Sequence, residues 1–357
     1  MTTQPIVDQT QAEAFLGKVF ADTSGMVVTI MASFGDRLGL FKNLAYGPAT
    51  SAQLATRAGL NERYTREWLS AMASAGYIVY DPASACFTLP PEHLPVLAQE
   101  NGLFFIGGIQ QFLLGISEQR QGVLQAFRHG GGIPLSAYSA DVWEGMARAS
   151  AGTVEHMLVP VWIPSMPAVQ AHLVQGALVA DVGCGQGRAL IKLAQSYPAS
   201  QYVGYDFFEP LIAQATRAAE QAGVADRVRF QCLDASQGLP ETYDVITTFD
   251  VVHDAVDPRG LLRAIRQALR PEGRYVCVEP SSSDKLEENA GPMGSLLYSV
   301  SVLYCMTTSL AEHGEGLGTV GLPESKLRKL CTDVGFHSIQ RKPMEDPFNT
   351  LYEITPS

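Results

Sequence analysis

Short apolar runs of strand length alternate with helix-forming segments over the second half of the chain. We expect strands at the start of Val179–Gly187 and in Gln201–Asp206, Val228–Asp234, Tyr243–Val252 and Arg274–Glu279. Strands that alternate with helices such as Pro258–Leu269 predict a parallel sheet with helices on both faces. Two further runs, His337–Arg341 and Asn349–Ile354, are joined by the short loop MEDPF and predict an antiparallel hairpin. The pattern therefore predicts an α/β fold with a seven-stranded, doubly wound sheet.

The first part of the chain has the spacing of helices instead. Apolar residues recur three and four positions apart in Ala12–Leu44, which predicts two helices with a break near Ser24–Gly25. Gly102–Ile116 is the most hydrophobic run, but it is too short to span a bilayer and has Gln110 and Gln111 at its centre. Because apolar helices of this kind rarely stay exposed on a monomer, we expect a buried helix or a homodimer contact here.

A compact helical module is predicted between these two regions. One helix begins at Thr50 or Ser51 and ends at Gly59, a second covers Glu62–Ala75, and the runs Tyr77–Tyr80 and Cys86–Leu89 flank a turn at Asp81–Pro82. This order of helix, turn, helix and hairpin is that of a winged helix. Winged helices can bind DNA, so a DNA-binding regulator is an alternative from another functional class. Residues 51–95, however, hold three arginines against four acidic residues, whereas a helix that reads DNA has a basic excess.

The two parts are joined by a segment that we assign to the first domain. Gly130–Gly132 predicts a flexible link, and Tyr138–Val174 predicts helices that end where prolines accumulate. We expect a helical and winged-helix dimerisation domain over residues 1–170 and a catalytic domain over residues 171–357. Five residues of the proline-punctuated region could line a pocket, although such residues at helical spacing are more often core: Trp143, Met146, His156, Met157 and Trp162.

Composition and charge narrow the functional class. Of the 357 residues, 46% are hydrophobic and 17% are charged, as in an ordinary soluble enzyme. A net charge of −11 disfavours nucleic acid as a partner, because such proteins gather lysine and arginine to neutralise phosphates. Six scattered cysteines without CxxC spacing fit a reducing compartment, and the N-terminal residues do not have the pattern of a signal peptide. We expect a cytoplasmic protein without a membrane partner.

The segment that organises the second half is Val179–Gly187, with the sequence VADVGCGQG. Its glycines stand at alternate positions: Gly183, Gly185 and Gly187. Glycine lets the backbone turn tightly, and the free N–H groups of the next helix then face a ligand. Asp206 ends the following apolar run, where a carboxylate can bind two ribose hydroxyls, and Asp234 ends the run after that. The pattern predicts a nucleotide-type site.

The DxGxGxG spacing and the acidic residues at three successive strand ends resemble the class I S-adenosylmethionine-dependent methyltransferases, which have a Rossmann-like sheet. The resemblance covers roughly the second half of the chain. It implies that Asp181 and the three glycines bracket the methionine part of the cofactor. It further implies that Asp206 holds the ribose, with Phe207 in the same site, and that Asp234 with Ala235 contacts the adenine. The winged helix resembles the dimerisation domain of small-molecule O-methyltransferases, which packs against a second copy.

The fourth predicted strand ends in VVHDAVDP, which places His253 and Asp254 at the carboxyl edge of the sheet, where ligands bind in open α/β folds. The pair resembles the His-Asp pair of plant-type O-methyltransferases, in which the histidine deprotonates a small-molecule acceptor. Imidazole suits this role because its ordinary pKa, about 6.5, is close to working pH. The plant enzymes usually continue with tryptophan where Ala255 stands here, so their aromatic pocket cannot be carried over. Asp254 could equally cap the next helix.

A metal site is the alternative at this edge. His313 lies in the glycine-rich segment SLAEHGEGLGTVG, which could fold back over the site. Two histidines and one carboxylate, here His253, Asp254 and His313, form the ligand set of a facial site for a divalent ion such as iron or zinc. The sequence is compatible in this respect with a small group of metal-dependent C-methyltransferases that act on α-keto acids. Glu279 and Glu315 are weaker candidates for supporting carboxylates.

Overall fold

The computed structural model describes residues 7–344, 346 and 348–356. The N-terminal residues, for which no signal peptide is predicted, lie partly outside the described residues. The same is true of the predicted MEDPF loop. The chain divides into two compact units, one up to Leu114 and the other from Gly115 onwards. By compactness, residues 115–170 group with the second unit. The predicted domain boundary near residue 170 stays a prediction.

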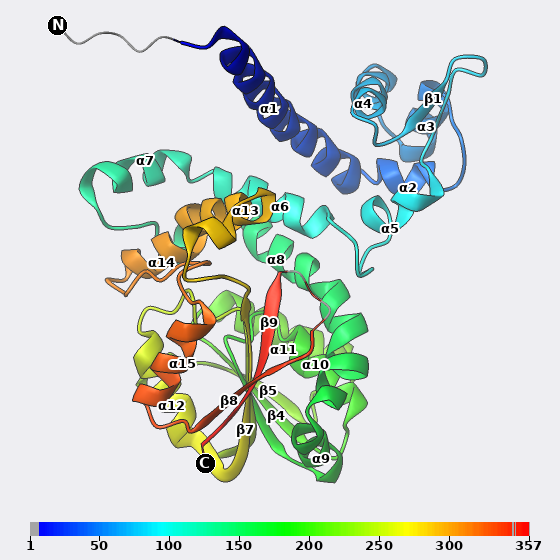
Figure 1. The fold of residues 1–357 in the computed structure, drawn as a ribbon. Helices are drawn as coiled ribbons and strands as arrows, with labels where there is room; N and C mark the ends of the chain where they lie inside the picture. Colours follow the sequence, from blue (N-terminus) through cyan, green and yellow to red (C-terminus); the bar gives the residue numbers. More distant parts are fainter. Residues whose placement is uncertain (1–6, 345, 347, 357) are drawn as a thin grey trace, which may run out of the picture. The chain divides into compact units, whose positions relative to one another are not determined.

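The first unit contains the predicted winged helix (Figure 1). Its elements are α1 Gln9–Arg37, α2 Leu40–Leu44, α3 Ser51–Ala58, α4 Glu62–Ser74, β1 Val79–Asp81, β2 Cys86–Thr88, α5 Leu94–Leu97 and the start of α6 Gly107–Ser117. The strands β1 and β2 pair antiparallel as the wing. Helix α3 begins with a capping box, in which the Thr50 hydroxyl accepts from the Gln53 N–H and the Gln53 side chain accepts from the Thr50 N–H. It ends at Gly59, which has left-handed φ of 69°.

The predicted break near Ser24–Gly25 is wrong. Helix α1 is continuous through both residues and ends at Arg37, and Gly39 with φ 66° begins the turn into α2. A glycine inside a helix costs only about 1 kcal/mol relative to alanine, so α1 can run through it. At Gly39 the left-handed backbone does interrupt the helix, because other residues rarely adopt that conformation.

Helix α6 is shorter than the apolar run that predicted it. Residues 102–106 lie outside the helix, and Gln110 and Gln111 are buried in the single chain. Among the elements of the first unit, α1 carries the largest number of exposed large apolar side chains. The exposed apolar surface that a second copy could cover therefore lies on α1 and not on α6.

The second unit is built on a seven-stranded sheet with the order β5-β4-β3-β6-β7-β9-β8 (Figure 1). The strands are β3 Leu178–Val182, β4 Gln201–Asp206, β5 Val228–Cys232, β6 Tyr243–Phe249, β7 Leu269–Pro280, β8 Ser338–Lys342 and β9 Asn349–Thr355. Strands β3 to β7 pair parallel, and β9 pairs antiparallel with β7 and β8. The predicted α/β fold and the C-terminal hairpin are confirmed.

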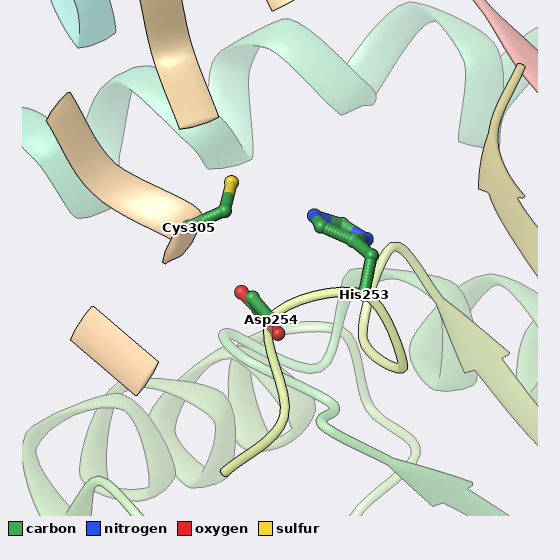
Figure 2. A group of neighbouring side chains, drawn as sticks. All are labelled: His253, Asp254 and Cys305. Atoms are coloured by element: carbon green, nitrogen blue, oxygen red, sulfur yellow. The ribbon is translucent and has the colours of Figure 1, made fainter. Parts of the chain in front are cut away.

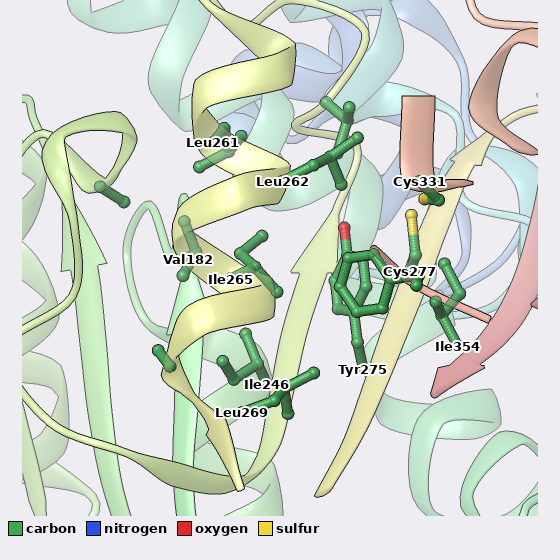
Figure 3. Packing of buried hydrophobic residues seen from close by; sticks show 14 of the residues in the cluster. Val182, Ile246, Leu261, Leu262, Ile265, Leu269, Tyr275, Cys277, Cys331 and Ile354 are labelled. Carbon is green, nitrogen blue, oxygen red and sulfur yellow. The ribbon is translucent and has the colours of Figure 1, made fainter. Parts of the chain in front are cut away.

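Helices cover both faces of this sheet, as expected for a doubly wound fold. The helices of this unit are α7 Arg120–His129, α8 Ala140–Thr153, α9 Pro167–Gln175, α10 Arg188–Ser196, α11 Glu209–Gln221, α12 Pro258–Ala268, α13 Pro292–Val300, α14 Met306–Ala311 and α15 Glu324–Asp333. Helices α12 and α15 bury apolar residues against one face. Figure 3 shows Ile265 of α12 beside Val182 and Ile246 of the sheet, and Leu262 belongs to the same cluster of buried residues. Helices α9, α10 and α11 contribute to the core on the other face.

The predicted helical region from Tyr138 to Val174 is confirmed, with an unusual centre. Helix α8 continues as a π-helix over Val154–Trp162 before α9 begins at Pro167. Met157 and Trp162 belong to the hydrophobic core, and Trp162 stacks on Phe249 with ring centroids 6.4 Å apart. These two pocket candidates are core residues.

Two helical runs among the described residues, Gln9–Arg37 and Pro292–Ala311, are long and apolar enough to cross a membrane by length and composition. A third would qualify if the bent pair Ala140–Ser165 and Pro167–Gln175 formed one span. The expected absence of a membrane partner thus stays a prediction.

Candidate active site

The glycine-rich turn between β3 and α10 has the backbone geometry that its sequence predicts. Gly183, Gly185 and Gly187 all have positive φ, at 72°, 53° and 75°. A Cβ at Gly187 would lie 2.4 Å from the Phe230 ring, so alanine would clash there. A Cβ at Gly185 would meet no heavy atom within 4 Å, so the turn leaves open space beside it.

Asp206, at the end of β4, ties this turn to the next one. Its Oδ2 accepts from the Gly185 N–H at 3.0 Å, and its Oδ1 accepts from the Phe208 N–H at 2.9 Å. Burial raises the pKa of this carboxyl, although the backbone N–H groups of Phe208 and Gly185 partly offset the effect. The adjacent Phe207 side chain is exposed. The predicted ribose-binding residues therefore lie at the glycine turn and keep accessible surface.

Asp234 and Ala235 follow β5 at the same edge of the sheet. The Asp234 Oδ1 accepts from the Ser236 N–H at 3.0 Å and from the Ser236 hydroxyl at 2.7 Å, and Ala235 is buried. The carboxylate is exposed while its orientation is fixed by these two bonds. The structure thus places the predicted cofactor residues other than Asp181 at the ends of β3, β4 and β5 and on the turns that follow them.

Asp181, the acidic residue of the DxGxGxG pattern, is buried within β3. Its Oδ1 accepts a hydrogen bond of 2.7 Å from the Thr247 hydroxyl. Burial raises the pKa of this carboxyl to about 7, the Thr247 bond lowers it, and Asp206 raises it further. Without cofactor, the folded protein therefore holds a proton on Asp181 over a pH range in which the unfolded chain has released it.

This difference predicts a pH-dependent effect of Asp181→Asn on stability. Between about pH 4 and pH 7 the raised pKa makes wild-type stability fall as pH rises, by up to about 1.4 kcal/mol per pH unit from this group. The asparagine variant lacks this titration, so its free energy of unfolding should gain on wild type as pH rises toward 7. Urea denaturation of the cofactor-free proteins at several pH values measures the difference. The exposed Asp226→Asn should run parallel to wild type, and parallel curves for Asp181→Asn would contradict the prediction.

His253 lies in the loop after β6, where its orientation is fixed by a buried carboxylate. Glu279 of β7 accepts from the His253 Nδ1–H at 2.8 Å, and both side chains are almost fully buried. Its two oxygens also accept from the backbone N–H groups of Val252, at 2.7 Å, and of His253, at 3.3 Å. Since an ionised carboxylate can only accept, Nδ1 carries the proton and Nε2 is the atom available for chemistry. Glu279, expected only as a weak supporting carboxylate, is the residue that orients His253.

Burial and neighbouring groups shift the pKa values of His253 and of the carboxyls beside it. Burial alone would lower the pKa of His253, but the nearby Cys305 sulfur and Glu279 carboxylate more than offset this and raise it. Burial raises the pKa of Asp254 to about 6 and that of Asp250 to about 7, although His253 lowers both. A cation bound in this pocket would favour the neutral imidazole.

Two residues here were not singled out from the sequence. Asp250 directly follows β6 and has φ 57°, and its N–H donates to the Val278 oxygen at 2.9 Å. Its position at the end of the fourth predicted strand could have identified Asp250 as a site residue from the sequence. Cys305, in contrast, lies in the apolar run SVLYC and gave no sign of a role.

The proposed metal ligand His313 is not brought to His253 and Asp254. The glycine-rich loop does fold back, since the Gly318 N–H donates to the His253 oxygen at 3.0 Å, and the Glu315 N–H donates to the Val256 oxygen at 3.0 Å. His313 itself is exposed just after α14, in left-handed backbone with φ 59°. Among the described residues, the group that could share an ion comprises His253, Asp254 and Cys305 (Figure 2). Glu315 is also exposed.

Trp143, one of the predicted pocket residues, does lie close to the site. Its ring is 5.1 Å from that of Phe208, beside Asp206, and 6.2 Å from that of Tyr304, the neighbour of Cys305. Tyr304 also contacts Tyr138, with centroids 5.2 Å apart. The aromatic rings thus form one side of the region between the cofactor turns and Cys305. Of the other candidates, Met146 is half-buried and His156 is exposed.

Fold and site together define a nucleotide-cofactor enzyme with a basic and an acidic group at the carboxyl edge of a parallel sheet. Residues 180–275 match a family model described as a methyltransferase domain, and residues 26–99 match an Rv2258c-like winged HTH domain. The chain is 26% identical over 350 residues to acetylserotonin O-methyltransferase from Mus musculus molossinus, covering 92% of this chain and 85% of that protein.

Solved structures agree on the fold. Human N-acetylserotonin methyltransferase in complex with SAM has a TM-score of 0.71 at 18% identity, covering 99% of this chain and all of that one. Mitomycin 7-O-methyltransferase has a TM-score of 0.69 at 19% identity, covering 98% of this chain and all of that one. This chain is a class I S-adenosylmethionine-dependent methyltransferase of the winged-helix, O-methyltransferase-like type that acts on a small molecule. The open space at Gly185 and the carboxylates Asp206 and Asp234 fit that cofactor.

Proposed function

We propose that this enzyme methylates a hydroxyl oxygen of a small-molecule acceptor and that His253 removes the hydroxyl proton. The observation that carries the proposal is the 2.8 Å bond between His253 Nδ1 and the buried Glu279, which leaves Nε2 as the ring nitrogen that takes the proton when the imidazole is neutral. Relatives named as O-methyltransferases support oxygen as the methylated atom, among them O-demethylpuromycin-O-methyltransferase from Streptomyces alboniger, 27% identical over 177 residues.

The chemistry asks little else of the protein. S-adenosylmethionine supplies a methyl group that is already activated by its sulfonium charge. The chain then has to align the acceptor and take up its proton. Glu279 stabilises the imidazolium that forms after proton transfer, while its three backbone bonds keep the His253 loop in place. Asp254 adds a second carboxylate, half-buried beside His253.

An acceptor screen tests the proposal. The purified enzyme is incubated with isotopically labelled S-adenosylmethionine and a panel of phenols, alcohols, amines and α-keto acids, and labelled products are identified by mass spectrometry. We expect label on an oxygen of a hydroxylated acceptor. Exclusive labelling of amine nitrogen or of the carbon of an α-keto acid would contradict O-methylation and leave the cofactor assignment intact.

We also propose a homodimer formed through α1. The helix carries a stripe of exposed apolar residues along one side: Phe15, Leu16, Val19, Phe20, Met26 and Val27. Phe15 is 66% and Phe20 is 73% exposed in the single chain. An apolar stripe of this length favours burial against another surface, and the resemblance of the winged helix to a dimerisation domain favours a second copy as that surface.

The variant Phe15→Glu/Phe20→Glu is expected to be monomeric. Burial of each phenylalanine side chain contributes about 1.5–3 kcal/mol, so the double substitution should weaken the dimer more than a hundredfold. Light scattering after size-exclusion chromatography measures the mass, and Gln11→Glu on the same helix is the matched control. A wild-type monomer that instead sediments with lipid vesicles would contradict both the dimer and the expected absence of a membrane partner.

We propose that nucleic acid is not a partner and that the enzyme is cytoplasmic. The arginines of the second winged-helix helix, α4, are engaged by carboxylates one turn away, since Arg66 pairs with Glu62 at 2.6 Å and Arg63 pairs with Glu67. Few positive charges therefore remain for phosphates on this helix. A salt-sensitive shift of genomic DNA fragments in a mobility assay would contradict the first proposal, and cell fractionation tests the second.

A further inference from the structure

Three side chains from two distant segments of the sequence face a common space beside the sheet edge (Figure 2). His253 and Asp254 come from the loop after β6, and Cys305 ends the π-helical segment Ser301–Cys305. One potential ligand atom from each side chain lies within 4.8 Å of the other two. His253 and Cys305 are buried and Asp254 is half-buried, so the group is enclosed by protein.

Two of these side chains are oriented by further hydrogen bonds. His253 donates its Nδ1–H to Glu279 at 2.8 Å, which turns Nε2 away from that carboxylate. The Thr319 hydroxyl donates to the Cys305 sulfur at 3.1 Å, and the Thr319 N–H donates to the Ser301 hydroxyl oxygen. Histidines that bind metals nearly always donate their other N–H to a carboxylate or carbonyl. The His253–Glu279 pair has that arrangement.

The donor set selects a class of ion. An imidazole nitrogen, a thiolate sulfur and one carboxylate oxygen suit zinc and similar first-row ions, whereas magnesium and calcium prefer oxygen ligands alone. Around tetrahedral zinc, ligand atoms stand about 3.5 Å apart, given zinc–ligand bonds of about 2.0–2.3 Å. The three ligand atoms lie within 4.8 Å of one another, so side-chain movements of about 1 Å or less bring them to the spacing around zinc. Three protein ligands also leave one position open, as in zinc sites that bind a water or substrate oxygen.

Charge favours the same conclusion. The Glu279 carboxylate lies 2.8 Å from His253 Nδ1, and an Asp254 carboxylate oxygen lies within 4.8 Å of a His253 ring nitrogen. The single histidine is the basic residue of this group, so the enclosed carboxylates outnumber it. A divalent ion would compensate the negative charge, which is costly to bury alone.

We propose that His253 Nε2, the Asp254 carboxylate and the Cys305 thiolate form a site for a zinc-type divalent ion with one position open to an acceptor oxygen. Binding releases the Cys305 proton to solvent. The ion and a proton compete for Nε2, so an ion held there would take the place of the base role proposed for His253 and would itself acidify a hydroxyl at the open position. The proposal replaces His313 with Cys305 as the third ligand. It does not rest on the proposed function: ion binding and proton removal are alternative uses of the same Nε2, and the cobalt absorption reads ion binding alone.

Cobalt(II) is the probe, because its bond to a thiolate gives a charge-transfer absorption that other ligands do not give. Full-length protein is freed of metal by dialysis against a chelator and titrated with cobalt(II) chloride. We expect one equivalent to bind with the charge-transfer band and zinc to displace it. A wild-type protein that binds no cobalt, or binds it without this band, would overturn the proposal.

Variants assign the ligands. Cys305→Ser should lose the band, and Asp254→Asn should keep it while binding cobalt roughly tenfold or more weakly. His313→Ala and Cys232→Ser, which alter an exposed histidine and an exposed cysteine, should behave as wild type. A band that persists in Cys305→Ser but disappears in Cys232→Ser would refute the site. Circular dichroism shows that each variant is folded, and the absorption readout is separate from methyl transfer.

Discussion

His253→Gln is expected to reduce kcat by about 10²–10⁴-fold and to leave S-adenosylmethionine binding almost unchanged. Glutamine is of similar size, but its amide cannot accept a proton at neutral pH, so the acceptor hydroxyl stays protonated. His253 lies in the loop after β6, apart from the turns after β3, β4 and β5 that carry the predicted cofactor residues. The binding energy of the cofactor should therefore be preserved.

Steady-state kinetics with the acceptor found in the screen, together with calorimetry of cofactor binding, measures the two effects separately. His313→Ala is the matched control, because it removes a histidine that is exposed and not grouped with His253. Full activity of His253→Gln would exclude both the base and the metal ligand at this position. Equal losses of kcat in His253→Gln and His313→Ala would instead support the metal site predicted from the sequence, in which both histidines are ligands.

The second large effect is expected for Asp206→Ala, which should weaken S-adenosylmethionine binding by about ten- to a hundredfold. Charge-assisted hydrogen bonds contribute about 1.5–3 kcal/mol, and each 1.4 kcal/mol corresponds to a factor of ten. Alanine also removes the acceptor of the Gly185 and Phe208 N–H groups, which loosens the glycine turn. Asp206→Asn keeps an acceptor oxygen and should have a smaller effect.

Calorimetric titration with S-adenosylmethionine measures the change. The exposed Asp226→Ala, in the same unit, is the control and should bind as wild type. Unchanged affinity in Asp206→Ala would contradict the ribose assignment. Binding of NAD in place of S-adenosylmethionine by the wild type would contradict the cofactor class, since a carboxylate at this strand end serves ribose in both kinds of enzyme.

The winged helix and the strands of the sheet could be predicted because their signals are local. Thr50 and Gly59 mark the ends of α3 through bonds within one turn of helix, and the three glycines set the backbone after β3 by their own conformational freedom. The break predicted near Gly25 failed for the opposite reason. A glycine permits a turn without requiring one, and the neighbouring residues kept α1 helical.

Only part of the site at the sheet edge could be predicted from the sequence. His253 and Asp254 could be placed at the end of β6, because the carboxyl ends of parallel strands share one edge. Their partners could not be identified. Glu279 reaches His253 because β7 pairs beside β6, and its role depends on that register. His313 seemed the natural third ligand by residue type, but its loop binds the His253 segment through backbone atoms and leaves the imidazole exposed.

The sequence by itself determined the α/β fold, the winged helix, the cofactor turns and the position of His253, since each follows from residues close together in the chain. The tertiary structure decided that Glu279 orients His253, that Trp143 lies beside the cofactor turns, and that Cys305 replaces His313 next to Asp254. The physical reason is range. Helix caps, strand periodicity and glycine turns act over a few residues, whereas contact between side chains on different elements depends on how the whole sheet and its helices pack.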